Sequence, residues 1–194
     1  DPVQLGLRES QAFAVRRFDR PRPGHRIHIE DFAQIVGVYP AAKYQKTNYD
    51  GLGRLMLAIA SRSGFEEYLR RLVFVLASGN GDAHLKNWSL IYRDGRTVEL
   101  SPAYDLVSTI QYIADDALAL NLGGSKKWKA VSAATFDRLA GKLRLEPPDV
   151  RLVVQEAVEK VLSAWRRDGA NFGFTLEQRE RLDRHLADIP LLAG

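Results

Sequence analysis

A polar run in the middle of this 194-residue chain carries the residue types that phosphoryl transfer requires. Asp82 is followed by Asn87, and a second carboxylate, Asp105, comes after a short apolar stretch. Asp82 could accept or orient the proton of an acceptor hydroxyl. Asn87 and Asp105 could ligate Mg²⁺, a hard cation that prefers oxygen. The spacing therefore predicts a catalytic base and a magnesium site.

Two further residues of this run, His84 and Lys86, leave alternatives open. His84 could contact the transferring phosphate or orient Asp82, or it could bond to a loop carbonyl as a structural residue. Lys86 could neutralise phosphate charge, or it could point into solvent. Asn-Gly-Asp is also a common turn sequence without any function. The functional interpretation therefore depends on the whole set occurring together.

The elements around this run must hold it in place. An apolar helix is expected to end at Ser78-Gly79, and a hairpin is expected to follow, because Asp-Gly separates two strand-like segments. Elsewhere the pattern predicts strands over 12–18 and 117–122, a short helix from about Glu30 to Gly37, and a turn over 49–53. A helix over about 55–62 is expected to end at Ser63-Gly64. The hairpin strands are expected over 88–92 and 97–100.

From Ser132 onward every segment has helical spacing, and Thr175 with Gln178 predicts a capping box. The predicted fold is mainly α, of the α+β class, with one domain over residues 1–194. A helical bundle would cover about 132–192. The small β element would carry the catalytic and metal-binding loops at about 79–108.

Composition narrows the class of protein. The chain is 45% hydrophobic and 27% charged, as in ordinary globular proteins. It contains no cysteine, which excludes disulfides and fits a cytoplasmic location. No run of about 18 apolar residues could span a membrane. The start has neither a methionine nor a signal peptide, so we expect a fragment or a processed chain. The net charge of +4 is more typical of a solvated surface than of nucleic-acid contact.

The motifs together resemble those of the HipA-like serine/threonine kinases, toxins of bacterial toxin–antitoxin modules. The catalytic loop also resembles that of phosphatidylinositol kinases. The matching segments, in chain order, are Arg17-Phe18-Asp19-Arg20, Ile29-Glu30-Asp31-Phe32-Ala33-Gln34, Lys43-Tyr44, Asn80-Gly81-Asp82-Ala83-His84-Leu85-Lys86-Asn87 and Pro102-Ala103-Tyr104-Asp105-Leu106-Val107-Ser108.

This resemblance implies the C-lobe of a protein-kinase-like fold that uses ATP and Mg²⁺ to phosphorylate protein hydroxyls. An aminoacyl-tRNA synthetase would be a substrate, so that translation arrest and persistence follow. By the same resemblance Asp82 is the catalytic base, and the backbone of Arg16 to Phe18 binds adenine within a hinge at about 12–19. Asp19 would lie near the ribose. The expected partner is an antitoxin of the HipB type, through which alone nucleic acid would be contacted.

The sequence departs from the family in one large respect. It holds no glycine-rich phosphate-covering loop and no N-lobe lysine, and Lys43 follows the hinge, so it is no substitute. We therefore expect a C-lobe whose N-lobe is supplied in cis or in trans. By itself the chain would be weakly active or inactive.

Two other functions remain open from the sequence. The chain could be a non-catalytic module that binds an antitoxin or a separate N-lobe. It could also be a small-molecule kinase, for which Asp115-Asp116 would supply an acidic acceptor pocket. The basic run at 125–129 could attract an acidic or RNA-bound substrate, although a solvated turn explains it as well.

Overall fold

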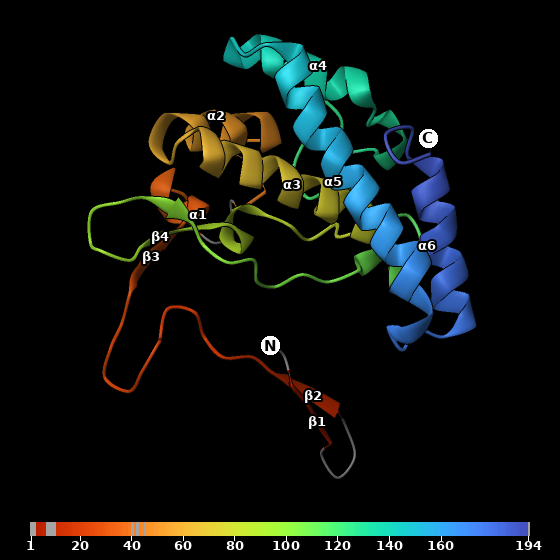
Figure 1. The fold of residues 1–194 in the computed structure, drawn as a ribbon, viewed down its shortest axis with the longest axis horizontal. Helices are drawn as coiled ribbons and strands as arrows, with labels where there is room; N and C mark the ends of the chain where they lie inside the picture. Colours follow the sequence, from red (N-terminus) through yellow and green to blue (C-terminus); the bar gives the residue numbers. More distant parts are fainter. Residues whose placement is uncertain (1–2, 7–10, 40, 42, 45, 194) are drawn as a thin grey trace.

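A computed structural model describes residues 3–6, 11–39, 41, 43–44 and 46–193 (Figure 1). The predicted fold class is confirmed: the described part is mainly helical and has a small antiparallel sheet. The larger helices are α2 (Tyr49–Ile59), α3 (Arg62–Ser78), α4 (Ala133–Leu143), α5 (Pro147–Asp168) and α6 (Leu176–Asp188). Short 3₁₀ helices lie at Leu85–Asn87, Thr109–Gln111, Trp128–Ala130 and Gly169–Asn171.

Helix α3 lies at the centre of the core, and the long α5 crosses both α3 and α4 (Figure 1). Most side chains along α3 are buried, because α2, α5 and α6 all contact it. The helix ends at Gly79, whose φ of 62° lies in the left-handed region that favours glycine. A Cβ at Gly79 would lie 2.5 Å from Cδ1 of Ile110. This glycine therefore directs the chain sharply from the core helix into the polar run.

The main sheet has the order β3–β4–β5, formed by His28–Asp31, Ser89–Tyr92 and Glu99–Leu100. Strand β4 follows the polar run directly and pairs with both neighbours antiparallel. The predicted hairpin is thus present, but its second strand is shorter than expected. Asp94 accepts hydrogen bonds from the backbone and hydroxyl of Thr97, which extends the turn at the expense of the strand. These bonds, the Thr97 side chain first, lower the pKa of Asp94 to about 2.

Several local predictions at the N-terminal side are wrong. The strand predicted over 12–18 is limited to β2 (Gln11–Ala14), which pairs with β1 (Val3–Gly6) in a hairpin set apart from the helices (Figure 1). The short helix α1 (Phe32–Ile35) begins later than expected, because Glu30 belongs to β3. Asp31 caps it by accepting a hydrogen bond from the backbone of Gln34.

The turn predicted over 49–53 is also wrong, because these residues form the first part of α2. Asn48 accepts a hydrogen bond from the backbone of Gly51 at 2.8 Å and so starts the helix. The helix ends at Ile59 instead of at 63–64, and Ser61 then caps α3. Gly53 of this helix allows close packing against α3, because a Cβ there would lie 3.3 Å from the Phe65 and Tyr68 rings.

The strand predicted over 117–122 is replaced by irregular backbone. Its apolar side chains are buried, but none of the described strands pairs with it, and one backbone bridge joins Leu122 to Ser125. The C-terminal helices agree with expectation, including the capping box in which Thr175 accepts from the backbone of Gln178. In the part of the chain that the structure describes, no helix is long and apolar enough to cross a membrane.

Candidate active site

The predicted catalytic loop, residues 79–87, joins the end of α3 to strand β4 and is held by two buried aromatic side chains. The hydroxyl of Tyr49 donates to the carbonyl of Ala83 at 2.9 Å, and the indole N–H of Trp88 donates to the same oxygen at 3.2 Å. Inside the loop, the side-chain oxygen of Asn80 accepts from the backbone N–H of Asp82 at 3.1 Å. The loop is therefore held between rigid elements, as catalytic loops require.

A second anchor comes from residues downstream of the loop. The hydroxyl of Thr109 accepts from the backbone of Gly81 at 2.6 Å and donates to the carboxylate of Asp116. The same carboxylate accepts from the backbone of Ala117 at 2.9 Å. Asp116 thus helps to hold the loop through Thr109. Both of its carboxylate oxygens accept hydrogen bonds from described residues. This geometry does not favour the acidic acceptor pocket of a small-molecule kinase.

Asp82 lies at the partly exposed edge of the loop, beside residues from an earlier segment. The hydroxyl of Tyr44 donates to Oδ1 of Asp82 at 2.6 Å. Burial, and then this hydrogen bond, raise the pKa of Tyr44 to about 12, so that the phenol stays protonated as a donor. An exposed carboxylate held by a neutral donor can accept a proton from an incoming hydroxyl.

His84 is buried and has N–H groups facing both of its ring nitrogens. Nε2 lies 2.6 Å from Nζ of Lys43, and Nδ1 lies 3.3 Å from the backbone nitrogen of Lys86. Burial lowers the pKa of His84, and Lys43 acts in the same direction, whereas Asp82 opposes it. A doubly protonated ring could accept neither contact, and a neutral ring can accept one of the two, at whichever nitrogen lacks the proton, so the arrangement favours neutral His84.

The two predicted metal ligands, Asn87 and Asp105, meet although 18 positions separate them. Nδ2 of Asn87 donates to Oδ2 of Asp105 at 2.6 Å. Oδ1 of Asn87 is buried and has no hydrogen-bond partner within the described residues. An orphaned buried oxygen is costly unless a ligand satisfies it. A carboxylate beside such an oxygen fits Mg²⁺, which usually takes one or two protein groups and completes its shell with water and phosphate.

The backbone at Asp105 supports the same interpretation. Its φ of 53° places a non-glycine residue in the left-handed region, a conformation that clusters at functional sites. The neighbouring Tyr104 keeps this segment against the catalytic loop, since its hydroxyl donates to the carbonyl of Lys86 at 2.7 Å. The Tyr104 ring also lies 5.9 Å from the ring of Phe18, which links the segment to the predicted hinge.

A pocket of about 1060 Å³ lies beside Asp105, one of the two predicted metal ligands, and is lined by the predicted nucleotide-binding residues. Arg16, Phe18, Asp19, Lys86 and Asp105 all line it. Its size falls at the upper end of the range for cofactor sites. Five residues chosen from three separate stretches of sequence therefore share one cavity.

Asp19 lines this pocket and is also paired with two arginines. Its carboxylate is nearly fully buried, and Arg17 at 2.7 Å and Arg20 at 2.5 Å both pair with it. The hydrogen bond from Arg17 is the main reason that the pKa of Asp19 is lowered, against the opposing effect of burial. Asp19 therefore orders the predicted hinge as well as lining the pocket.

Some residues of the site were given no role from the sequence. Lys43 and Tyr44 stood only within a family motif, Tyr49 and Thr109 had no signal of their own, and Asp116 was considered only as part of an acidic acceptor pocket. Lys43, Tyr44, Tyr49 and Thr109 reach the loop through long-range contacts that local patterns do not encode, and Asp116 acts through Thr109. The basic run at 125–129 is partly structural: Trp128 is buried, and Lys129 pairs with Asp188 at 3.1 Å.

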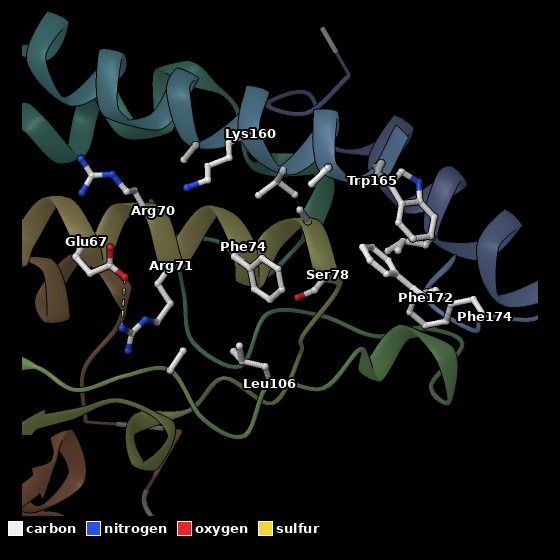
Figure 2. A pocket seen from close by; sticks show the side chains of 17 residues that line it. Glu67, Arg70, Arg71, Phe74, Ser78, Leu106, Lys160, Trp165, Phe172 and Phe174 are labelled. Carbon is white, nitrogen blue, oxygen red and sulfur yellow. Dashed lines mark hydrogen bonds and ion pairs between the residues drawn. The ribbon is translucent and has the colours of Figure 1, made fainter. Parts of the chain in front are cut away.

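A separate apolar hollow of about 590 Å³ lies between α3, α5 and α6 (Figure 2). Phe74 lies in its middle, with Trp165, Phe172 and Phe174 gathered at one end (Figure 2). It contains none of the predicted site residues. Ala103 and Leu106, on either side of Tyr104 and Asp105, line both cavities.

The family model described as HipA-like C-terminal domain matches residues 2–165. "Putative kinase Y4dM" of Sinorhizobium fredii is 44% identical over 191 residues, which cover 98% of this chain and 46% of that protein. "Serine/threonine-protein kinase toxin HipA" of Shewanella oneidensis is 33% identical over 124 residues, covering 53% of this chain and 28% of the toxin.

Among solved structures, a chain of the Shewanella oneidensis MR-1 complex of HipA, HipB and operator DNA has the same fold. The TM-score is 0.78 at 20% identity, and the match covers 98% of this chain and 50% of that one. The chain therefore spans about half or less of the length of these relatives.

Proposed function

The chain belongs to the HipA-like C-terminal domain family, as its motifs predicted, and from this premise we propose that it supplies the catalytic loop and metal site of an ATP- and Mg²⁺-dependent serine/threonine protein kinase. The observation that carries the proposal is the contact between Asn87 and Asp105 at 2.6 Å, beside a large pocket and the Asp82 loop. Homologues that are named as kinases support it.

Each residue has a defined role in this proposal. Asp82 accepts the proton of the acceptor hydroxyl as the new bond to phosphorus forms. Oδ1 of Asn87 and the carboxylate of Asp105 hold Mg²⁺, which when bound neutralises charge on the nucleotide phosphates. Lys86, on the rim of the same pocket, adds a positive charge near those phosphates.

The nucleotide would occupy the 1060 Å³ pocket. The backbone of Arg16 to Phe18 would bind adenine, and the Phe18 ring would pack beside it. The Asp19 carboxylate is already paired with Arg17 and Arg20, so a ribose hydroxyl would bind only as an additional hydrogen-bond donor to the same oxygens. Its main contribution is therefore to keep the hinge in shape.

The wider biology follows from the family. We propose a protein hydroxyl as acceptor, on an aminoacyl-tRNA synthetase, so that phosphorylation arrests translation and produces persistence. The proposed partner is an antitoxin of the HipB type, because the structural match is a HipA–HipB complex. A phosphate-covering loop and lysine, in cis or in trans, would complete the nucleotide site.

The test is transfer of labelled phosphate from ATP by the protein expressed from its complete reading frame. Asp82→Asn should reduce labelling of the protein itself or of a synthetase by about 10²–10⁴-fold, because the general base is lost. Asp94→Asn, at the exposed hairpin turn, is the matched control and should label as the wild type does. Equal labelling by the wild type and Asp82→Asn would refute the proposed mechanism, whereas absence of labelling by the wild type would leave the non-catalytic binding module as the better description.

A further inference from the structure

Lys43 reaches the acceptor side of the catalytic loop from 41 positions earlier in the chain. Its ammonium Nζ lies 2.6 Å from Nε2 of His84, and its carbonyl accepts from the backbone of Leu85 at 3.4 Å. The ammonium also lies 4.9 Å from the centre of the Tyr44 ring, within the range of a cation–π contact. Three independent contacts thus hold one lysine next to Asp82.

The contact with His84 leaves most of the hydrogen-bonding capacity of Lys43 unused. An ammonium carries three N–H donors. When the proton of neutral His84 is on Nδ1, Nε2 accepts one of them, and no other side-chain or backbone acceptor is bonded to Nζ in the described part of the chain. The side chain is only partly buried, so its remaining donors can reach an incoming group.

Lys43 is close to Asp82 without forming an ion pair with it. The imidazole separates the two charges, since Nε2 of His84 lies 3.8 Å from Oδ1 of Asp82. Asp82 instead accepts from the neutral phenol of Tyr44 at 2.6 Å. A direct ion pair would make the carboxylate a weaker base. The arrangement therefore provides a cation beside the base while leaving the base able to accept a proton.

We propose that Lys43 is a further catalytic residue, whose ammonium contacts the oxygens of the transferring phosphoryl group, and that His84 is the residue that positions it. This inference rests on the proposed kinase function. In the step, the acceptor oxygen forms a bond to the γ-phosphorus and its proton passes to Asp82. The bond between that phosphorus and the ADP oxygen breaks, and ADP leaves with the electron pair.

The two lysines near the loop then serve different parts of the nucleotide. Lys86 is exposed and lines the large pocket together with Asp19 and Asp105. Lys43 does not line that pocket and contacts His84 instead. The transferring group would thus meet a cation on the acceptor side as well as on the nucleotide side. Such preorganised charge is the main means by which phosphoryl transfer is catalysed.

The test compares Lys43→Met, Lys43→Arg and Lys160→Met in the protein from its complete reading frame. Lys160 is exposed on α5 and makes no ion pair among the described residues, so it is a matched control. Self-labelling from ATP should fall by about 10²-fold in Lys43→Met and recover in part in Lys43→Arg, which keeps the charge. Affinity for Mg·ADP should be unchanged, whereas added aluminium fluoride, a mimic of the transferring group, should no longer tighten binding.

Two results would overturn the inference while leaving the kinase function intact. One is wild-type labelling by Lys43→Met together with loss of labelling by Asp82→Asn. The other is a Lys43→Met variant that loses Mg·ADP affinity and thermal stability in parallel with activity, which would make the lysine purely structural. Absence of ATP-dependent labelling by the wild type would overturn the kinase function and the role of Lys43 together.

Discussion

Asn87 and Asp105 are joined by a hydrogen bond of 2.6 Å from Nδ2 to Oδ2, and the remaining oxygen of the amide is buried without a partner in the described chain. The amide is thereby oriented by the carboxylate that it accompanies. Burial of its unsatisfied oxygen costs free energy unless a ligand binds to that oxygen. This relationship makes the metal site the most direct feature to test.

We expect Mg²⁺ to strengthen ADP binding in the wild type and to have little effect in Asn87→Ala or Asp105→Asn. Asn87→Ala removes the amide oxygen and Asp105→Asn removes the carboxylate charge that would hold the ion, and asparagine tolerates the left-handed backbone at position 105. Isothermal titration with ADP, with and without Mg²⁺, measures the effect. Asp94→Asn should retain the full enhancement. Enhancement in all variants would place the ion elsewhere.

Arg71 and Arg70 are neighbours on α3 with opposite surroundings. Arg71 is buried, and burial lowers its pKa. It donates to the buried carbonyl of Ser101 at 2.8 Å, just before the segment that contains the predicted metal ligand Asp105. Arg71→Leu leaves that carbonyl unsatisfied and should lower the free energy of unfolding by about 1–3 kcal/mol. Arg70 is exposed and pairs with Glu66 at 3.6 Å, so Arg70→Leu should cost less than about 1 kcal/mol.

Urea denaturation followed by circular dichroism measures both variants. Arg71→Leu should also weaken Mg·ADP binding, because the segment that it supports leads to Asp105. Equal costs for the two arginines would contradict the assigned role of the Ser101 contact.

Gly81 is predicted to tolerate no side chain. A Cβ there would overlap the Asp116 carboxylate and lie 2.6 Å from the carbonyl of Ala117. Gly81→Ala should therefore destabilise the protein by about 1–3 kcal/mol and displace the catalytic loop. Gly141→Ala, in α4, meets nothing within 4 Å and should stabilise by about 0.5–1 kcal/mol. Opposite signs in thermal or urea unfolding are the expected result, and a neutral Gly81→Ala would refute the close contact.

Stability should decrease as the pH falls below about 6.5. His185 is buried against Trp128, with Nε2 2.7 Å from the carbonyl of Leu76, and burial lowers its pKa. The unfolded chain therefore binds the proton at a higher pH than the folded protein, so lowering the pH favours unfolding. His84, whose pKa burial also lowers, contributes in the same direction.

His185→Gln should flatten this dependence, because glutamine keeps an N–H donor without titrating. Unfolding free energies from urea titrations between pH 8 and pH 5 provide the measurement. If the variant keeps the wild-type slope, the loss of stability at low pH has another origin.

Local rules in the sequence were sufficient for much of this protein. The end of α3 at Gly79, the hairpin after it and the C-terminal helices all follow from periodicity, turn residues and capping residues. Asp82, His84, Asn87 and Asp105 could be selected because spacing within one loop, and one nearby carboxylate, is visible in a linear chain. The family followed from the same motifs.

The tertiary structure alone decided which distant residues complete the site. Lys43 reaches His84 across 41 positions, and Thr109 reaches Gly81 across 28. The early start of α2 and the loss of the strand over 117–122 likewise depend on what packs beside each segment. Propensity describes a residue and its near neighbours, whereas these contacts arise only when buried surfaces meet. The sequence determined the chemistry of the loop, and packing determined which lysine and which hydroxyls surround it.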